Sequence, residues 1–434
     1  MRRRAVPERV SPGDLVQIAT DVGPVPMNVG ALLTLGPGAD PATTAALVAE
    51  RLHRVPRLRQ RLVDPPPGLG RPYWVDADRV PAVPVVELAG RRLVDVTTDA
   101  VVRPLDLRRP PWRAVVVADD GRAVGVVVVV HHVLADGVSG LAVLRGLVDE
   151  GAARGRTDRV PSPDASAAPS TLDLLLDVWR ERGGALRDAR RTVGRWRDAR
   201  GELGRRTGRA PRCSLCAPTG PRRRAGSVEA DLAPLRSATR RHGASVNDAL
   251  VVAATGAMRA VLAARGEDVE RLVVSVPVSG RPAADGDALG NQVGVIPVAA
   301  PVHGSTQERL AAVAGTTRAG RRAGRGASAA VVGPAFRALA AVGAFRAVVD
   351  RQRLVNTFLT NLVGPTDVLH LAGARVEGLL PLTVTAGNVG VAFAALSYAG
   401  RLTVVAITDP DVVPELDVLL RALDRELAAV AALP

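Results

Sequence analysis

The chain has 434 residues and a net charge of +14, in which 57 basic residues, all of them arginine, outweigh 43 acidic ones. This length exceeds one typical hydrophobic core and predicts two domains of about 200 residues each. Because arginine replaces lysine throughout, in a chain rich in alanine, valine and glycine, we attribute the basic balance to a GC-rich genome; with only 2% aromatic residues, it does not indicate a nucleic-acid-binding module.

No uninterrupted apolar run reaches the roughly 18 residues of a membrane-spanning helix, and no apolar segment follows Arg2–Arg4 as it would in a signal peptide. We therefore expect a cytoplasmic protein, either soluble or attached peripherally to a membrane or to lipid droplets. Cys213 and Cys216 form a single CxxC motif. Because a second ligand pair and a thioredoxin-like context are both missing from the sequence, we interpret the two thiols as inert and expect no bound metal.

The first predicted strand is Ala31–Leu35, which follows the proline-rich segment Pro24–Gly30. A helix is predicted over Pro41–Leu52, because Asp40 precedes it as a cap and its apolar residues recur at helical spacing.

A hairpin is predicted further along, with Arg113–Ala118 as its first strand and Asp119–Arg122 as its turn, since Asp-Gly between apolar runs favours a tight turn. The second strand contains five consecutive valines, Val126–Val130. Such a β-branched apolar run predicts a strand that is buried on both faces. It ends in His131 and His132.

Two imidazoles at the end of a rigid strand suit acid–base chemistry, because imidazole titrates near neutral pH and the strand fixes its position. Asp136 and Gly137 close the following turn, and a helix is predicted from Val138 to Val148. Asp136 also stands where a helix N-cap belongs, so capping is the structural alternative. Trp112, just before the hairpin, fits core packing as well as it fits a place in the site.

A basic segment separates the two halves of the chain. Fifteen arginines oppose four acidic residues between Arg180 and Arg224, which accounts for eleven of the fourteen net positive charges. Within it, Leu172–Trp196 is weakly amphipathic. We interpret it as a solvated linker; the alternative is a lipid-surface contact, to which each arginine would contribute ~1 kcal/mol. The predicted division is an N-terminal domain over 1–170, a basic linker over 171–226 and a C-terminal domain over 227–434.

In the second half, Ser245 and Asp248 form a capping box that predicts a helix through Ala264. Capping explains Asp248 but not Asn247 beside it. The other predicted elements of this half are a strand over Leu272–Val278, a strand within Asn356–Pro365, a hairpin of Val391–Tyr398 and Arg401–Thr408, and a helix over Pro414–Leu433. Strands and helices that alternate irregularly, with repeated hairpins, indicate mixed α+β domains.

The segment His131–Gly137 fits the pattern HHxxxDG and so resembles the acyl-CoA-dependent acyltransferase superfamily. Further segments, in order along the chain, resemble motifs of the bacterial wax ester synthase/diacylglycerol acyltransferase family. They are Pro24–Gly30 (PMHVG, with Asn28 in place of His), Pro110–Trp112 (PLW), Asn247–Asp248 (ND), Val276–Pro282 with Leu289–Asn291 (VPVSxRP and LGN), and Thr360–Pro365 (SNVPGP). This ordered set distinguishes the chain from condensation domains, which share the histidines.

The resemblance implies an α+β, two-domain fold like that of chloramphenicol acetyltransferase, with mixed sheets flanked by helices and an active-site channel between the domains. It also implies an O-acyltransferase that moves a long-chain acyl group from acyl-CoA to a hydroxyl of diacylglycerol or a fatty alcohol. Such an enzyme forms no acyl-enzyme and needs no cofactor, since acyl-CoA is a substrate. A carrier-bound acyl donor and a catalytically silent lipid-binding homologue are the alternatives, and the acceptor alcohol stays open.

The same resemblance assigns His132 as the general base, a role that typically accelerates a reaction about 10²–10⁴-fold. His131, Asp136, Gly137 and Asn247 complete the expected catalytic set. Gly137 would let the backbone approach the channel closely, and Asn247 would donate a hydrogen bond to the oxyanion.

Supporting roles follow for the remaining motif residues. Asp136 is expected to hold its loop, with Arg281 as its candidate partner. Pro111, Trp112 and Asp248 are expected to line the substrate channel.

Overall fold

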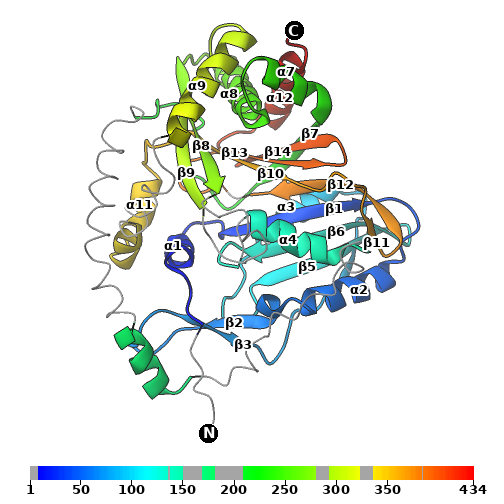
Figure 1. Cartoon of the computed structure of the whole chain (residues 1–434), viewed down its shortest axis with the longest axis vertical. Coiled ribbons are helices and arrows are strands. Elements are labelled where there is room, and N and C mark those ends of the chain that lie inside the picture. Colours follow the sequence, from blue (N-terminus) through cyan, green and yellow to red (C-terminus); the bar gives the residue numbers. More distant parts are fainter. Residues whose placement is uncertain are drawn as a thin grey trace.

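Two six-stranded sheets, stacked face to face, form the centre of the protein in the computed structural model (Figure 1). The structure describes residues 8–134, 137–149, 169–180, 209–279, 293–322, 336–383 and 385–434. Parallel and antiparallel strand pairs both occur, and helices flank the sheets. The predicted mixed α+β fold is therefore confirmed.

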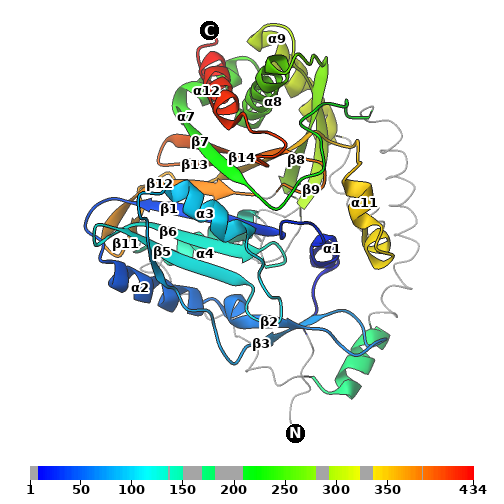
Figure 2. The same ribbon diagram turned by 180° about the vertical axis from the view of Figure 1, so that it is seen from behind.

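The first sheet has the strand order β11-β12-β1-β6-β5-β4. Helices α2 and α4 pack on one of its faces and α3 on the other, which Figure 2 shows against β1 and β6. The bounds of these elements are β11 (His370–Leu371), β12 (Ala374–Leu382), β1 (Asn28–Leu35), β6 (Arg122–His131), β5 (Trp112–Asp119), β4 (Val85–Glu87), α2 (Pro41–His53), α4 (Gly137–Leu147) and α3 (Leu93–Val102). Beside this sheet lie α1 (Pro12–Thr20), the short 3₁₀-helix η1 (Pro56–Arg59) and the hairpin of β2 (Gln60–Val63) and β3 (Tyr73–Asp76).

The valine run of β6 is buried on both faces, as the sequence predicts. Val126, Val128 and Val130 pack into the cluster formed with α2 and α4. Val127 and Val129 pack on the opposite face, in a cluster that joins α3 to strands of the second sheet. Because side chains alternate along a strand, only an unbroken apolar run fills both clusters.

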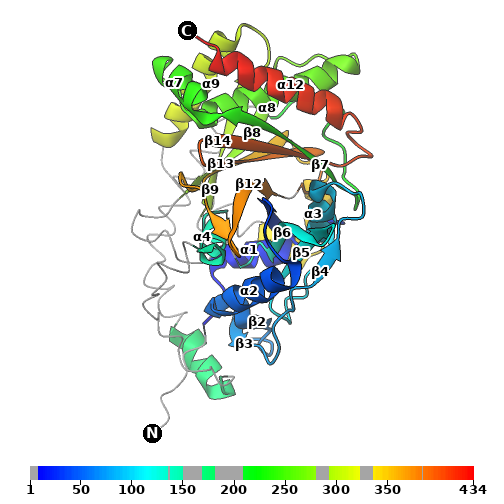
Figure 3. The same ribbon diagram turned by 90° about the vertical axis from the view of Figure 1, so that its right-hand side faces the viewer.

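The second sheet has the strand order β7-β14-β13-β10-β8-β9. Figure 3 shows its outer face covered by α7, α8, α9 and α12. The bounds are β7 (Arg224–Asp231), β14 (Arg401–Thr408), β13 (Val391–Tyr398), β10 (Thr357–Val363), β8 (Arg271–Ser279), β9 (Val293–Pro301), α7 (Leu232–Arg241), α8 (Val246–Ala264), α9 (Thr306–Arg322), α11 (Phe345–Val349), which lies to one side, and α12 (Leu416–Ala431). The β13–β14 hairpin has the predicted bounds.

Helix α8 begins at the predicted capping box, in which Ser245 and Asp248 bond reciprocally. Among the described residues it is the one helix long and apolar enough to cross a membrane, and 72% of that window is buried inside the protein. Its apolar sequence is explained by its position, since it packs between the second sheet, α9 and α12.

Strand β12 crosses between the two halves of the chain. It follows β10 in sequence, yet it pairs with β1 in the first sheet, where Leu32 lies opposite Leu380. This strand is not predicted from the sequence, because no local pattern identifies a partner almost 350 residues away.

The predicted linker begins with a helix over residues 171–180, drawn in green at the lower left of Figure 1. Leu174 packs against Tyr73 and Val75 of the β2–β3 hairpin. The carboxylate of Asp177 also accepts a hydrogen bond from Arg9, at 2.6 Å. This part of the predicted linker is therefore attached to the hairpin, and residues 181–208 lie outside the described residues.

Candidate active site

The two histidines occupy the end of β6, and two motif segments hold their backbone. The N–H of His131 donates to the carbonyl of Pro111 at 2.9 Å, and that of His132 donates to the carbonyl of Met27 at 2.7 Å. The segments Pro24–Gly30 and Pro110–Trp112 therefore meet at the histidines, although they are far apart in sequence.

The side chain of His131 is a buried structural link. Its Nδ1 accepts the N–H of Val133 at 3.1 Å, and its Nε2 lies 3.0 Å from Oδ2 of Asp21. Because Nδ1 is an acceptor, the ring proton is on Nε2 and is donated to Asp21. His131 is 0% exposed, so it positions its neighbour and does not face solvent itself.

Asp21 joins the His131 ring to the Pro24–Gly30 segment, which holds the backbone of His132. Its Oδ2 accepts from His131, and its Oδ1 accepts the N–H of Met27 at 2.9 Å. Met27 in turn accepts from the backbone of His132. Asp21 is not predicted from the sequence, since it lies before the Pro24–Gly30 motif and 110 residues from its histidine partner.

We predict that Asp21→Ala lowers the free energy of unfolding by about 1.5–3 kcal/mol, because the buried Nε2–H of His131 loses a charged acceptor. Acyl transfer is expected to slow about tenfold or more, since His132 shares the anchoring segment and small displacements of a catalytic group are costly. Urea unfolding and kcat measure the two effects. Asp78→Ala is the matched control, because Asp78 is an exposed loop residue; an equal loss in both variants would contradict the role of Asp21.

His132 is half-buried at the first residue after β6. Its Nδ1 atom is buried. The helix that follows, α4, begins at Gly137. Asp136 and Arg281, predicted to pair and hold this loop, lie outside the described residues.

Asn28 occupies the motif position where His is usual, and it lies opposite His131 in the pairing of β1 with β6. Its side chain is fully buried and donates to the carbonyls of Val101 and Arg103, each at 2.9 Å. It therefore ties β1 to the end of α3.

Trp112 is 2% exposed and packs in the core on the α2 side of the first sheet. Its indole N–H donates to the carbonyl of Leu58 at 2.6 Å. These contacts favour core packing over a place along the channel. The buried Pro111 contributes through its carbonyl, which accepts from His131.

Asp248 caps α8, since its Oδ2 accepts from the N–H and the hydroxyl of Ser245 at 2.8 and 2.7 Å. It is 4% exposed, and this capping contact accounts for it better than channel lining does. Asn247 is half-buried in the first turn of the helix. Within the described part of the chain, no hydrogen bond joins Asn247 to the histidines.

Comparison with known proteins places these residues in a family context. The family model of the wax ester synthase/diacylglycerol acyltransferase catalytic domain matches residues 10–250, and that of the WS/DGAT C-terminal domain matches residues 289–431. A probable diacylglycerol O-acyltransferase of Mycobacterium tuberculosis is 29% identical over 438 residues, covering 94% of this chain and 92% of the relative.

Solved structures share the fold. A wax ester synthase/diacylglycerol acyltransferase from Marinobacter aquaeolei VT8 aligns with a TM-score of 0.68 at 22% identity, covering 97% of this chain and 98% of that one. The starter condensation domain of rhizomide synthetase aligns with a TM-score of 0.64 at 16% identity, covering 99% and 94%.

Proposed function

This chain belongs to the wax ester synthase/diacylglycerol acyltransferase family, and we propose that His132 is the general base of its reaction. The protein is an acyl-CoA-dependent O-acyltransferase that acts on diacylglycerol or alcohol hydroxyls. Within that activity we propose transfer of a long-chain acyl group. The reaction as proposed uses acyl-CoA as a substrate and draws on no cofactor.

In the proposed mechanism, Nε2 of the neutral His132 ring takes the proton of the acceptor hydroxyl as its oxygen attacks the thioester carbonyl. The tetrahedral oxyanion collapses, the carbon–sulfur bond breaks, and the departing CoA thiolate accepts the proton from the imidazolium. The products are an ester and free CoA, and no acyl-enzyme forms. The base is needed because a hydroxyl is a weak nucleophile at neutral pH.

One observation supports this assignment: of the two adjacent histidines, His131 is fully buried, whereas His132 is half-buried. His131 is committed to Asp21 and Val133, whereas His132 is half-buried and held through its backbone. A fixed backbone on a partly exposed residue suits a general base, because proton transfer depends on hydrogen-bond distance first and on pKa second.

We assign the oxyanion donor to Asn247. It lies in the first turn of α8, where the helix dipole favours developing negative charge. Its amide makes no hydrogen bond to any residue that the structure describes, so it is available to a reacting oxygen. Such a donor typically contributes about 10²–10³-fold to kcat.

CoA release by the purified protein tests the proposed function. Palmitoyl-CoA would be supplied with either 1-hexadecanol or dioleoylglycerol, and free thiol would be followed over time with ester formation. We expect acceptor-dependent CoA release with one ester per thiol. Thiol release with neither acceptor, or without ester, would contradict acyl transfer from CoA to a lipid hydroxyl.

We further propose that the protein attaches peripherally to a membrane or lipid-droplet surface from the cytoplasm. Leu172, Leu175 and Trp179 lie on one side of the 171–180 helix and are 55%, 40% and 71% exposed. The strongly basic sequence of Arg180–Arg224 follows directly. Exposed apolar residues next to basic ones favour binding at an anionic lipid surface.

We predict that Trp179→Ser weakens binding to vesicles of phosphatidylcholine and phosphatidylglycerol about tenfold, because burial of a large apolar side chain contributes roughly 1.5–3 kcal/mol. Vesicle flotation measures this change. Val342→Ser is the matched control, since Val342 is 76% exposed outside this helix. Equal binding by both variants and the wild type would contradict the proposed attachment.

A further inference from the structure

Cys213 and Cys216 lie in a turn that the rest of the fold holds fixed. The N–H of Cys216 donates to the carbonyl of Cys213 at 3.0 Å, which closes a tight turn. Between them, Leu215 is 0% exposed, and its carbonyl accepts the N–H of Gly390. The N–H of Ser214 donates to Glu267 at 2.9 Å. The backbone at the two cysteines is therefore already set.

The two sulfur atoms are already neighbours, with the thiol of Cys213 donating to Sγ of Cys216 at 3.6 Å. A tight turn brings its first and fourth Cα atoms within about 7 Å, which overlaps the range of about 4.4–6.8 Å that a disulfide requires. A disulfide bond of about 2.05 Å therefore needs the sulfurs to approach by about 1.5 Å, which side-chain rotation can supply.

Asn356 makes the two thiols unequal. Its Nδ2 lies 3.3 Å from Sγ of Cys216 and 3.9 Å from that of Cys213. The amide is 1% exposed and cannot turn away, because its Oδ1 accepts from Val273 and its Nδ2 donates to Pro211, each at 2.9 Å.

The hydrogen bonds from Cys213 and Asn356 lower the pKa of the Cys216 thiol. Donation to Cys216 and burial raise the pKa of the Cys213 thiol. Cys216 is therefore the more readily ionised thiol and attacks first, and Cys213 attacks second. An acidic thiol beside a second thiol is the arrangement of dithiol–disulfide exchange.

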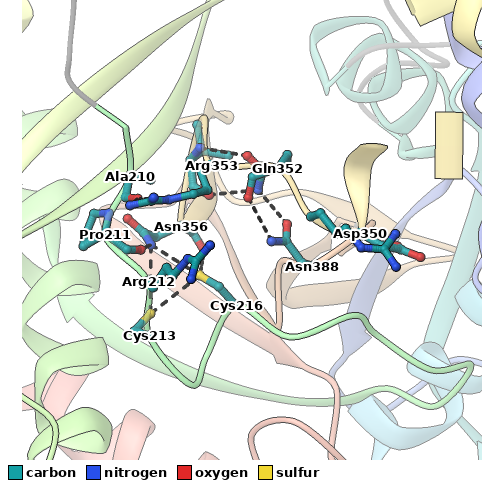
Figure 4. A pocket seen from close by; sticks show the side chains of 12 residues that line it. Ala210, Pro211, Arg212, Cys213, Cys216, Asp350, Gln352, Arg353, Asn356 and Asn388 are labelled. Carbon is teal, nitrogen blue, oxygen red and sulfur yellow. Dashed lines mark hydrogen bonds between the residues drawn. The ribbon is translucent and has the colours of Figure 1, made fainter. Parts of the chain in front are cut away.

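Both cysteines line a cavity of about 360 Å³, shown in Figure 4. Arg212, Arg351 and Arg353 line it too, against one acidic residue, Asp350, so its lining is net basic. The amides of Gln352 and Asn388 add hydrogen-bonding groups to the wall (Figure 4). Such a cavity gives an anionic, peptide-like disulfide access to Cys216.

We propose that Cys213 and Cys216 form a reversible dithiol–disulfide site that reacts with small anionic disulfides. The Cys216 thiolate attacks one sulfur of R–S–S–R, forms a mixed disulfide and expels RS⁻. Cys213 then gives up its proton and attacks the Cys216 sulfur, which expels the second RS⁻. The protein dithiol is oxidised by two electrons, and the small disulfide is reduced to two RSH. The site is distinct from the histidines, and the expectation that the thiols are inert is replaced by this proposal.

A structural metal site would be the competing explanation of a CxxC motif. A closed zinc site takes four ligands. Among the residues that the structure describes, no group of three or more histidine, cysteine, aspartate or glutamate side chains could hold a metal ion. The Asn356 amide beside Cys216 suits a thiolate, and the arginines that line the cavity suit an anionic partner. Glu267 is the acidic neighbour, and its charge opposes ionisation of both thiols.

To test this, the full-length protein is equilibrated with reduced and oxidised glutathione at a series of ratios. The reaction is quenched in acid, free thiols are alkylated with N-ethylmaleimide, and the mass of the intact chain is measured by mass spectrometry. We expect the doubly labelled form to be replaced, as the oxidised share rises, by an unlabelled monomer lighter than the dithiol by two hydrogen atoms. Two labels at every ratio would overturn the proposal, as would labelling that appears only after a chelator is added.

Two matched variants test the assigned roles. In Cys213→Ser, Cys216 is expected to react with iodoacetamide at pH 7 about tenfold faster than Cys213 does in Cys216→Ser, because more of it is thiolate. Cys213→Ser should also retain one glutathione as a mixed disulfide, because no second thiol resolves it. Equal rates, or glutathione retained equally by both variants, would contradict the assignment of Cys216 as the attacking thiol.

Discussion

Replacing His132 with alanine is expected to lower the rate of CoA release by about 10²–10⁴-fold, the typical contribution of a positioned general base. The acceptor hydroxyl would then have to lose its proton to water. KM for acyl-CoA should change little, since the imidazole is proposed to act on the acceptor proton. Steady-state kinetics with palmitoyl-CoA and the better acceptor measure the loss.

The same variant is expected to fold normally. His132 is half-buried, and the contact with Met27 uses its backbone N–H, which alanine retains. His131→Ala provides the contrast, because it removes a fully buried ring bonded to Asp21 and Val133 and should lower the thermal midpoint as well as the rate. A His132→Ala protein that unfolds at the wild-type temperature yet keeps more than a tenth of the rate would contradict the proposed base.

The second large effect concerns a buried ion pair that attaches the start of β7 to the end of β14. Nη1 of Arg223 lies 3.5 Å from Oδ2 of Asp409, and their side chains are 3% and 0% exposed. The guanidinium also donates to the carbonyls of Gly220 and Thr385, at 2.7 and 3.0 Å. We predict that Arg223→Met lowers the free energy of unfolding by about 3–5 kcal/mol, because it leaves the Asp409 carboxylate buried without its countercharge.

Burial lowers the pKa of Arg223 to about 10, and the charge of Asp409 only partly opposes that effect. Loss of hydration therefore outweighs the attraction, so removing both charges should cost less than the two single changes together. Urea unfolding of Arg223→Met, Asp409→Asn and the double variant measures this coupling. Strict additivity would contradict it.

A neighbouring pair supplies the matched control. Arg222, next to Arg223 in sequence, bonds Asp411, two residues after Asp409, but their side chains are 68% and 50% exposed. Exposed ion pairs contribute about 0–1 kcal/mol. Arg222→Met is therefore expected to leave the free energy of unfolding within about 1 kcal/mol of the wild type, and a cost equal to that of Arg223→Met would show that burial is not the cause.

Much of the fold follows from local sequence. The Asp-Gly turn predicts the β5–β6 hairpin, the five valines predict a strand buried on both faces, and the capping box predicts the first residue of α8. Each of these features depends on residues close together in the chain. Side-chain alternation and capping act over a few residues, so a sequence displays them directly.

Three features that the sequence could not show depend on contacts between residues far apart in the chain. Asp21 carries no motif, and only the fold brings it to His131. The role of Trp112 is decided by Leu58, whose carbonyl accepts the indole N–H. Pairing of β12 with β1 likewise has no local signal, since the strand leaves its own half of the chain.

The placement of β12 has a consequence for how the protein is made. During synthesis, β1 and β6 can pair as soon as both have emerged from the ribosome, but the other edge of β1 has no partner until residue 382 is available. Over that interval an apolar strand presents unpaired N–H and C=O groups, the condition that favours aggregation. Contacts of such large sequence separation also slow folding. The first sheet is therefore completed only when β12 has emerged. Until then, correct folding depends on the open edge of β1 being shielded from other chains.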